Sequence, residues 1–210
     1  ALAGSSLSAS AQPAAAPAPA PASAPVASEV TTQLPRTARP SHYAIEVTPH
    51  ADAMTFDGKV RIDLDVLVPT DTLVLQAANL AFDGGSLVAA AGGKPLPAKV
   101  SVDAENQTAS FAFGQVLAPG RYVLSTGYRG VINTQANGLF ALDYATPEGQ
   151  KRALYTQFEN SDARRFVPSW DEPDFKATFD LAVVAPAGQM VVSNMPVAST
   201  EEVGGGRTRT

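Results

Sequence analysis

Apolar and polar residues alternate along most of the chain from residue 34 onward. The clearest run is VRIDLDVLV at residues 60–68, in which valine, isoleucine or leucine occupies every even position. An alternation of this kind places the apolar side chains on one face of a strand and the charged ones on the other. We therefore predict a strand with one buried and one exposed face over this run.

Shorter runs of the same kind recur along the chain, and residues typical of tight turns separate them. Further strands are predicted at residues 43–47, 72–76, 86–90, 99–102, 109–113, 122–128, 153–158, 177–184 and 190–193. Turns rich in Gly, Asn, Asp or Pro are predicted at residues 57–58, 83–85, 92–93, 119–120, 137–138, 147–149 and 186–188. Many short strands with regular turns indicate an all-β fold, an antiparallel β-sandwich or saddle. No segment shows the pattern of an amphipathic helix.

The N-terminal part of the chain has a different composition. Residues 10–28 consist almost entirely of Ala, Pro and Ser, and such a sequence cannot bury enough apolar area to form a core. The Ala-x-Ala pattern at residues 9–11 is typical of the end of a secretory signal, and the alternative is further low-complexity linker. We predict a signal remnant at residues 1–11, a disordered Ala/Pro/Ser linker at residues 12–33 and a folded domain at residues 34–210.

The two ends of the sequence add expectations about the whole protein. The signal-like pattern predicts an exported protein that is periplasmic or associated with the cell envelope. The chain begins with Ala1 rather than Met, and we interpret its last residues, GGGRTRT, as a turn with no strand after it. We therefore expect this sequence to be a piece of a longer protein.

Composition excludes several classes of function. Fifteen basic and twenty acidic residues give a net charge of −5 without a basic run, so nucleic-acid binding is not expected. The sequence contains no cysteine and no run of about 20 apolar residues, which excludes disulfides, thiolate metal sites and a predicted membrane-spanning segment. The two histidines, His42 and His50, lack the i, i+4 helical spacing of a zinc motif, so we predict no metal site within this chain.

One stretch departs from the alternating pattern. Residues 156–180, TQFENSDARRFVPSWDEPDFKATFD, concentrate polar, charged and aromatic side chains. Gln157 and Glu159 would project from the same face if the preceding strand continued that far. A carboxylate and an amide oxygen together suit an ammonium group. The alternative is that Glu159 forms an ordinary surface ion pair with Arg164 or Arg165.

Other acidic residues of the stretch suggest a structural role. Asp171 and Glu172 are adjacent, and adjacent side chains of an extended segment point to opposite sides. A shared catalytic role for this pair is therefore not expected. Their charges instead have basic candidates nearby at Arg164, Arg165 and Lys176.

The stretch resembles a signature of zinc aminopeptidases of the aminopeptidase N class. In that class a Q-F-E-x-x-D-A-R-R run is followed by a D-E-P run and a K-A-T-F strand, and about 25 residues here match this pattern. Pro40 and Tyr43 resemble the P-x-x-Y at the start of the family's first strand, and residues 193–196 match its S-N-M-P. The family's Y-x-G-x-x-N…G-(F/Y) run is matched by Tyr128, Gly130, Asn133, Gly138 and Phe140.

The resemblance implies a fold, an activity and roles for particular residues. It implies an N-terminal β-saddle domain that packs on a thermolysin-like catalytic domain, in an enzyme that removes N-terminal residues from peptides. Glu159 would bind the substrate's free α-amino group, and Gln157 would help to line that site. A structural or interface role is expected for Asp162, Arg164, Arg165, Asp171 and Glu172.

The resemblance also implies a zinc ion that this chain does not bind. The family's G-x-M-E-N loop and H-E-x-x-H helix do not occur in the sequence, so we expect the zinc and the catalytic residues to lie outside it. This chain by itself is then expected to be inactive. The alternatives are a non-catalytic scaffold or binding module of the same family and, from the strand pattern alone, an unrelated adhesion or carbohydrate-binding sandwich.

Overall fold

The computed structural model describes residues 34–210. The predicted signal remnant at residues 1–11 and the linker at residues 12–33 lie outside this part of the chain. The described part contains twelve strands and the short 3₁₀-helix η1 (Ala163–Arg165). The strands are β1 (Ala38–His50), β2 (Thr55–Val66), β3 (Thr70–Gln76), β4 (Ala81–Ala89), β5 (Leu96–Asp103), β6 (Thr108–Leu117), β7 (Gly120–Val131), β8 (Gly138–Thr146), β9 (Gly149–Gln157), β10 (Thr178–Pro186), β11 (Glu201–Gly204) and β12 (Arg207–Arg209).

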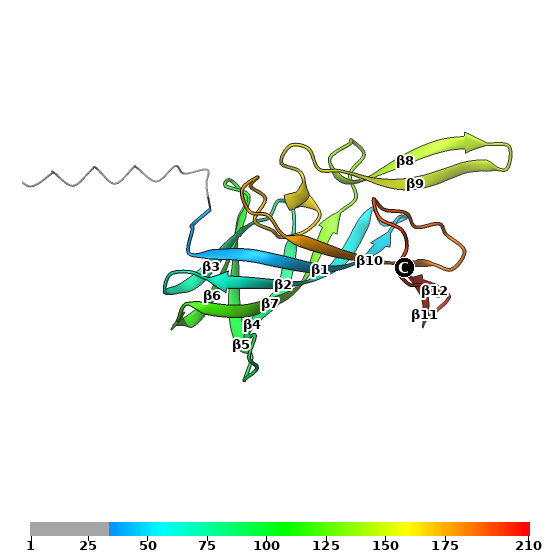
Figure 1. Ribbon diagram of the computed structural model, residues 1–210. Helices are drawn as coiled ribbons and strands as arrows, with labels where there is room; N and C mark the ends of the chain where they lie inside the picture. The colour runs from blue at the N-terminus through cyan, green and yellow to red at the C-terminus, as the bar shows by residue number, and fades with distance from the viewer. Residues whose placement is uncertain (1–33) are drawn as a thin grey trace, which may run out of the picture. The chain divides into compact units, whose positions relative to one another are not determined.

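Ten of these strands form one sheet and the other two form a separate hairpin. The order in the large sheet is β11-β12-β10-β1-β2-β7-β4-β5-β6-β3, and the hairpin pairs β8 with β9. Strands β1, β2 and β7 are long and lie side by side in the middle of the sheet (Figure 1). The all-β prediction is confirmed. The sheet is mixed rather than purely antiparallel, because β10 runs parallel to β1.

A single hydrophobic cluster forms the core. Strand β2 shows how the alternating sequence produces this core. Every second residue from Phe56 to Val66 is buried, while most of the intervening residues are more exposed. Leu73 and Leu75 of β3 and Phe111 of β6 belong to the same cluster as the buried residues of β2. The β6–β3 end of the sheet therefore packs its apolar side chains against those from the middle of the sheet, as in a sandwich.

Residues 57–58 form part of a strand and not the predicted turn. Gly58 lies inside β2, opposite Tyr128 of β7, and it is buried. A Cβ atom at this position would collide with the ring of Tyr128. The glycine of this Asp-Gly pair therefore allows the Tyr128 ring to lie close to the backbone of β2. Close approach to a backbone is a common reason for a glycine inside a strand.

This contact leads to a stability prediction. We expect Gly58→Ala to lower the free energy of unfolding by about 1–3 kcal/mol, because the core must move to accept the methyl group. The matched control is Gly127→Ala on β7, where the nearest atom to the new Cβ would be an Asp83 oxygen at 3.8 Å. Urea unfolding of both variants measures the difference, and equal free energies of unfolding would contradict the prediction.

Other local predictions also need correction. Residues 83–85 lie within β4, where the pairing with β7 shifts between Phe82 and Gly84, so they form a bulge and not a turn. Residues 190–193 form no strand. Strands β8, β11 and β12 were not predicted. The final residues continue past their glycine turn into β12, which pairs with β10 and β11.

The β8–β9 hairpin directly precedes most of the polar stretch at residues 156–180. Its two strands pair from Gly138 opposite Gln157 to Thr146 opposite Gly149, and the predicted turn at residues 147–149 connects them. The hairpin projects from the large sheet in Figure 1. Leu139 at its base is buried, whereas Tyr144 and Tyr155 further along it are exposed. The hairpin thus ends, at Gln157, where the candidate site begins.

Candidate functional site

The segment after β9 has little regular structure. Strand β9 ends at Gln157, so the strand does not continue to Glu159 and the expected same-face arrangement does not apply. The side-chain oxygen Oε1 of Gln157 instead accepts hydrogen bonds from the backbone N–H groups of Phe158 at 2.9 Å and Glu159 at 3.3 Å. Gln157 therefore holds the first turn of the chain that presents Glu159.

The carboxylate of Glu159 is exposed and is not paired with either nearby arginine. Arg164 Nε lies 2.8 Å from Asp171 Oδ2, and Arg165 Nε lies 2.7 Å from Asp162 Oδ1. Within residues 34–210 the structure shows no ion pair to Glu159. The alternative that Glu159 forms a surface pair with Arg164 or Arg165 is therefore wrong.

Four of the predicted structural residues form these two ion pairs. Arg164 and Asp171 are 16% and 14% exposed, so each charge has lost most of its water and needs the other as a partner. Arg164 also donates a hydrogen bond from Nη2 to the backbone oxygen of Asp171. The two pairs join η1 to the residues on either side of it, which fixes the irregular segment internally.

Glu172 has different partners from Asp171, as expected for adjacent residues. Its Oε1 accepts hydrogen bonds from the backbone N–H of Leu34 at 2.6 Å and from Nε2 of Gln76 at 3.2 Å. Its Oε2 lies 3.0 Å from Nη2 of Arg36. Lys176, the other basic candidate, forms no ion pair within the described part of the chain. Sequence reasoning missed Gln76, which no motif marks and which merely ends a predicted strand.

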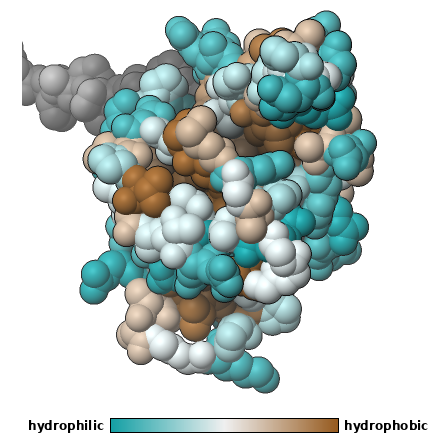
Figure 2. All heavy atoms as spheres, turned by 90° about the vertical axis from the view of Figure 1, so that its right-hand side faces the viewer, coloured by the Kyte–Doolittle hydropathy of each residue, from teal (hydrophilic) through white to brown (hydrophobic). Residues whose placement is uncertain are grey.

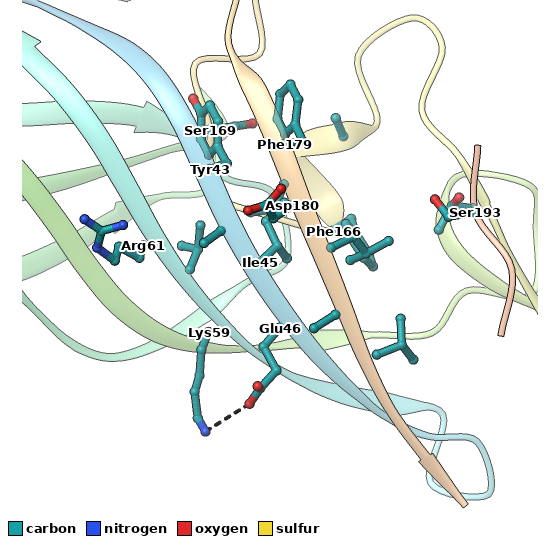
Figure 3. A pocket seen from close by; sticks show the side chains of 18 of the residues that line it. Tyr43, Ile45, Glu46, Lys59, Arg61, Phe166, Ser169, Phe179, Asp180 and Ser193 are labelled. Carbon is teal, nitrogen blue, oxygen red and sulfur yellow. Dashed lines mark hydrogen bonds and ion pairs between the residues drawn. The ribbon is translucent and has the colours of Figure 1, made fainter. Parts of the chain in front are cut away.

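A groove of about 2090 Å³ runs along this segment, and we call it the saddle groove. Its lining comes from β1, β2, β4, β5, β7 and β10, from residues 156–159, from six residues between Ala163 and Asp171, and from residues 191–199. Figure 3 shows part of it, with the rings of Tyr43 and Phe179 side by side and Lys59 directed toward Glu46. The two rings stack with their centroids 4.9 Å apart.

The acidic side chains in this lining differ in how their charge is balanced. A hydrogen bond from Arg209 is the main cause that lowers the pKa of Glu46, and Lys59 lies 3.3 Å from the same carboxylate. Asp171 is paired with Arg164, as described above. Asp83 lies 3.7 Å from Arg129, and Asp180 lies 3.4 Å from Nε2 of His42. Among the described residues, Glu159 is the one acidic residue of the groove without a basic neighbour within 4.0 Å.

The histidines do not form a metal site. His50 Nε2 contacts Asp57 Oδ2 at 2.8 Å, and His42 Nδ1 contacts the hydroxyl of Thr178 at the same distance. Residues 34–210 contain no group of three His, Cys, Asp or Glu side chains placed to hold a metal ion. The described residues therefore do not fit the zinc that the sequence resemblance implies. No helix in this part of the chain has the length and apolar character needed to cross a membrane.

Large apolar side chains are exposed beside the groove. Phe179 and Leu181 continue the apolar face of β1 onto β10, because they pair with Tyr43 and Ile45, yet they are 60% and 43% exposed. Met195, which also lines the groove, is 76% exposed. The face of the molecule shown in Figure 2 carries hydrophobic patches between polar areas. Exposed apolar surface of this kind is typical of an interaction surface.

Comparisons with known proteins assign the fold and the stretch to one family. Residues 39–210 match the family model of the Peptidase M1 N-terminal domain. The chain therefore belongs to this family, which is the family of the sequence resemblance.

Named relatives agree with this assignment. Aminopeptidase N of Acetobacter pasteurianus is 38% identical over 178 residues, which are 84% of this chain and 49% of the relative. Aminopeptidase M1 of Arabidopsis thaliana is 38% identical over 82% of the chain and 20% of its own length. Endoplasmic reticulum aminopeptidase 1 of Mus musculus is 30% identical over 83% of the chain and 19% of its own length. The chain thus spans half or less of the length of these relatives.

Proposed function

We propose that this chain is the N-terminal domain of a zinc-dependent aminopeptidase that removes N-terminal residues from peptides. In this proposal Glu159 binds the free α-amino group of the substrate, and Gln157 lines the same site. The relatives with the names aminopeptidase N and aminopeptidase M1 support the activity. The observation that supports the role of Glu159 is its unpaired carboxylate in a groove whose other acidic residues have basic neighbours.

The chemistry of the site suits recognition of a charged chain end. An ammonium group offers N–H donors to a carboxylate, and such charge-assisted hydrogen bonds are stronger than neutral ones. A substrate without the ammonium would leave the carboxylate desolvated and unpaired once the groove is closed, which costs free energy. An exposed Glu159 without an internal partner can provide this selection, whereas a carboxylate already paired with an arginine cannot.

We propose that the remaining parts of the enzyme lie outside residues 34–210. Zinc would be held there, in a thermolysin-like catalytic domain. Exposed Phe179 and Met195, which line the same groove as Glu159, support contact between the groove and that domain. Export to the periplasm or cell envelope is proposed from the Ala-x-Ala pattern alone.

Cleavage by the full-length protein tests the activity. We expect hydrolysis of an aminoacyl p-nitroanilide with a free amino group, and a kcat/KM lower by about 100-fold or more for its N-acetylated form, because acetylation removes the charge. We also expect a zinc chelator to abolish the hydrolysis. Equal cleavage of both substrates, or no cleavage of either by the metal-loaded protein, would contradict the proposed function.

A further inference from the structure

The irregular segment that follows Glu159 depends on contacts from elsewhere in the fold. Between Gln157 and Thr178 the only regular element is η1, which spans Ala163–Arg165. Backbone groups outside helices and strands need other hydrogen-bond partners when they are buried. Many of the partners lie within the segment itself, but most of those contributed by the rest of the fold belong to residues 76–78.

Backbone hydrogen bonds join the end of β3 to the segment at two places. The N–H of Gln76 donates to the oxygen of Ser169 at 2.8 Å, and the N–H of Ser169 donates to the oxygen of Gln76 at 3.1 Å. Two residues further on, the N–H of Ala78 donates to the oxygen of Arg164 at 2.9 Å. The chain from Arg164 to Ser169 is therefore aligned along residues 76–78.

The side chain of Gln76 adds a third connection. Its Oε1 accepts a hydrogen bond from the backbone N–H of Asp171 at 2.8 Å, and its Nε2 donates to Oε1 of Glu172 at 3.2 Å. Gln76 is 3% exposed, so water cannot readily replace it in these bonds. No other buried side chain of the described residues uses both ends of an amide to hold this segment.

The contacts of Glu172 extend this connection to the start of the described chain. Glu172 is 12% exposed and receives the N–H of Leu34 together with the guanidinium of Arg36. Arg36 also contacts Asp174 at 2.6 Å and lies over the ring of Phe175, with its Cζ atom 4.5 Å from the ring centroid. Gln76 thus links the core sheet to a cluster at the far end of the segment, beside the hydroxyl of Tyr43 on β1, which accepts a hydrogen bond from the N–H of Trp170 at 3.1 Å.

The near end of the segment, where Glu159 lies, is held by contacts within the segment. Asp162 is bonded through its N–H to the oxygen of Phe158 and through its carboxylate to Arg165. The ring of Phe158 packs on Phe166, with centroids 5.3 Å apart. In the sequence, Glu159 therefore lies between the end of β9 and residues 162–172, which residues 76–78 help to hold in place.

We propose that Gln76 is a positioning residue for Glu159, because it holds residues 169–172 of the segment whose Phe166 ring packs on Phe158, the residue before Glu159. The inference rests on the proposed function of Glu159 as the anchor of the substrate amino group. Gln76 does not touch the substrate in this account. It acts by holding the carboxylate of Glu159 where the ammonium must arrive, and a small displacement of such a group has a large effect on rate.

A double-mutant cycle in the full-length protein tests the proposal. Gln76→Met keeps the size of the side chain but removes both hydrogen bonds, and we expect it to lower kcat/KM for a free-amine substrate about tenfold. In a Glu159→Ala background the same substitution should have almost no further effect, because the group that it positions is absent. Ile62→Val, a fully buried change in β2, is the control for lost stability and should leave kcat/KM of the folded enzyme unchanged.

The outcomes separate this inference from the proposed function. The positioning role would be overturned if Gln76→Met lowered kcat/KM equally in both backgrounds, or in neither. The kcat/KM of Glu159→Ala alone would still test whether Glu159 binds the amino group. No loss from Glu159→Ala would overturn the proposed function and the positioning role with it. If Gln76→Met does not fold, Gln76→Glu provides the same cycle, because it keeps an acceptor for the N–H of Asp171 and replaces the donor to Glu172 with a like charge. Additive effects of that variant would count against the proposal.

Discussion

Replacement of Glu159 by Ala in the full-length protein is expected to lower kcat/KM for a free-amine substrate by about 30- to 1000-fold. This corresponds to about 2–4 kcal/mol of lost transition-state stabilisation, the cost of removing one partner of a desolvated ion pair. Glu159 has no ion pair within residues 34–210, so its loss breaks no internal salt bridge of the domain. The free energy of unfolding should therefore change by less than about 0.5 kcal/mol.

Steady-state kinetics of three variants measure this effect. Glu159→Gln keeps a hydrogen-bond acceptor without the charge, so its loss should be smaller than that of Glu159→Ala. Glu105→Ala removes an exposed glutamate from the β5–β6 connection, away from the groove lining, and should behave like the wild type. An unchanged kcat/KM for Glu159→Ala would contradict the proposed role.

Replacement of Phe56 by Ala is expected to have the largest effect on stability. Phe56 is completely buried, and its ring contacts Tyr128 at a centroid distance of 6.3 Å and Phe166 at 5.8 Å. The substitution leaves a cavity between the sheet and the irregular segment, and such changes cost about 3–5 kcal/mol. Phe166 packs on Phe158, the residue before Glu159, so the cavity would lie next to the residues that hold the candidate site in place.

Urea unfolding followed by tryptophan fluorescence measures this loss, since Trp170 is the only tryptophan of the chain. The control is Tyr155→Ala on β9, where the side chain is 50% exposed and the expected change is within about 0.5 kcal/mol. If Phe56→Ala lowered the free energy of unfolding by less than about 1 kcal/mol, the packing of this ring would not stabilise the domain as proposed.

The strands could be predicted wherever alternation of apolar and polar residues was long enough. Strand β2 is the best example, because one of its faces is buried along its whole length. The glycines were harder to interpret, because the sequence around Gly58 and Gly84 is typical of a turn. In the structure, Gly58 makes room for the ring of Tyr128, and Gly84 lies at a β-bulge. Strands β11 and β12 are too short to show a period, and they are defined by pairing with β10.

The candidate site could be predicted only as far as its residues are neighbours in sequence. Residues 156–180 are conspicuous because charged and aromatic residues are concentrated there, and the family resemblance they carry is confirmed by the match to residues 39–210. Gln76 could not be found in this way. It lies 95 residues before Asp171 along the chain, and its role depends on the fold that brings the end of β3 to the segment.

The affinity of two matched inhibitors tests the role of Glu159 most directly. The pair is an amino-acid hydroxamate and the same hydroxamate without its α-amino group, measured against the full-length wild-type protein and Glu159→Ala. Our account predicts that the substitution weakens the amino compound by about 30-fold or more and leaves the des-amino compound nearly unchanged. Equal weakening of both compounds, or of neither, would contradict the claim that Glu159 binds the amino group.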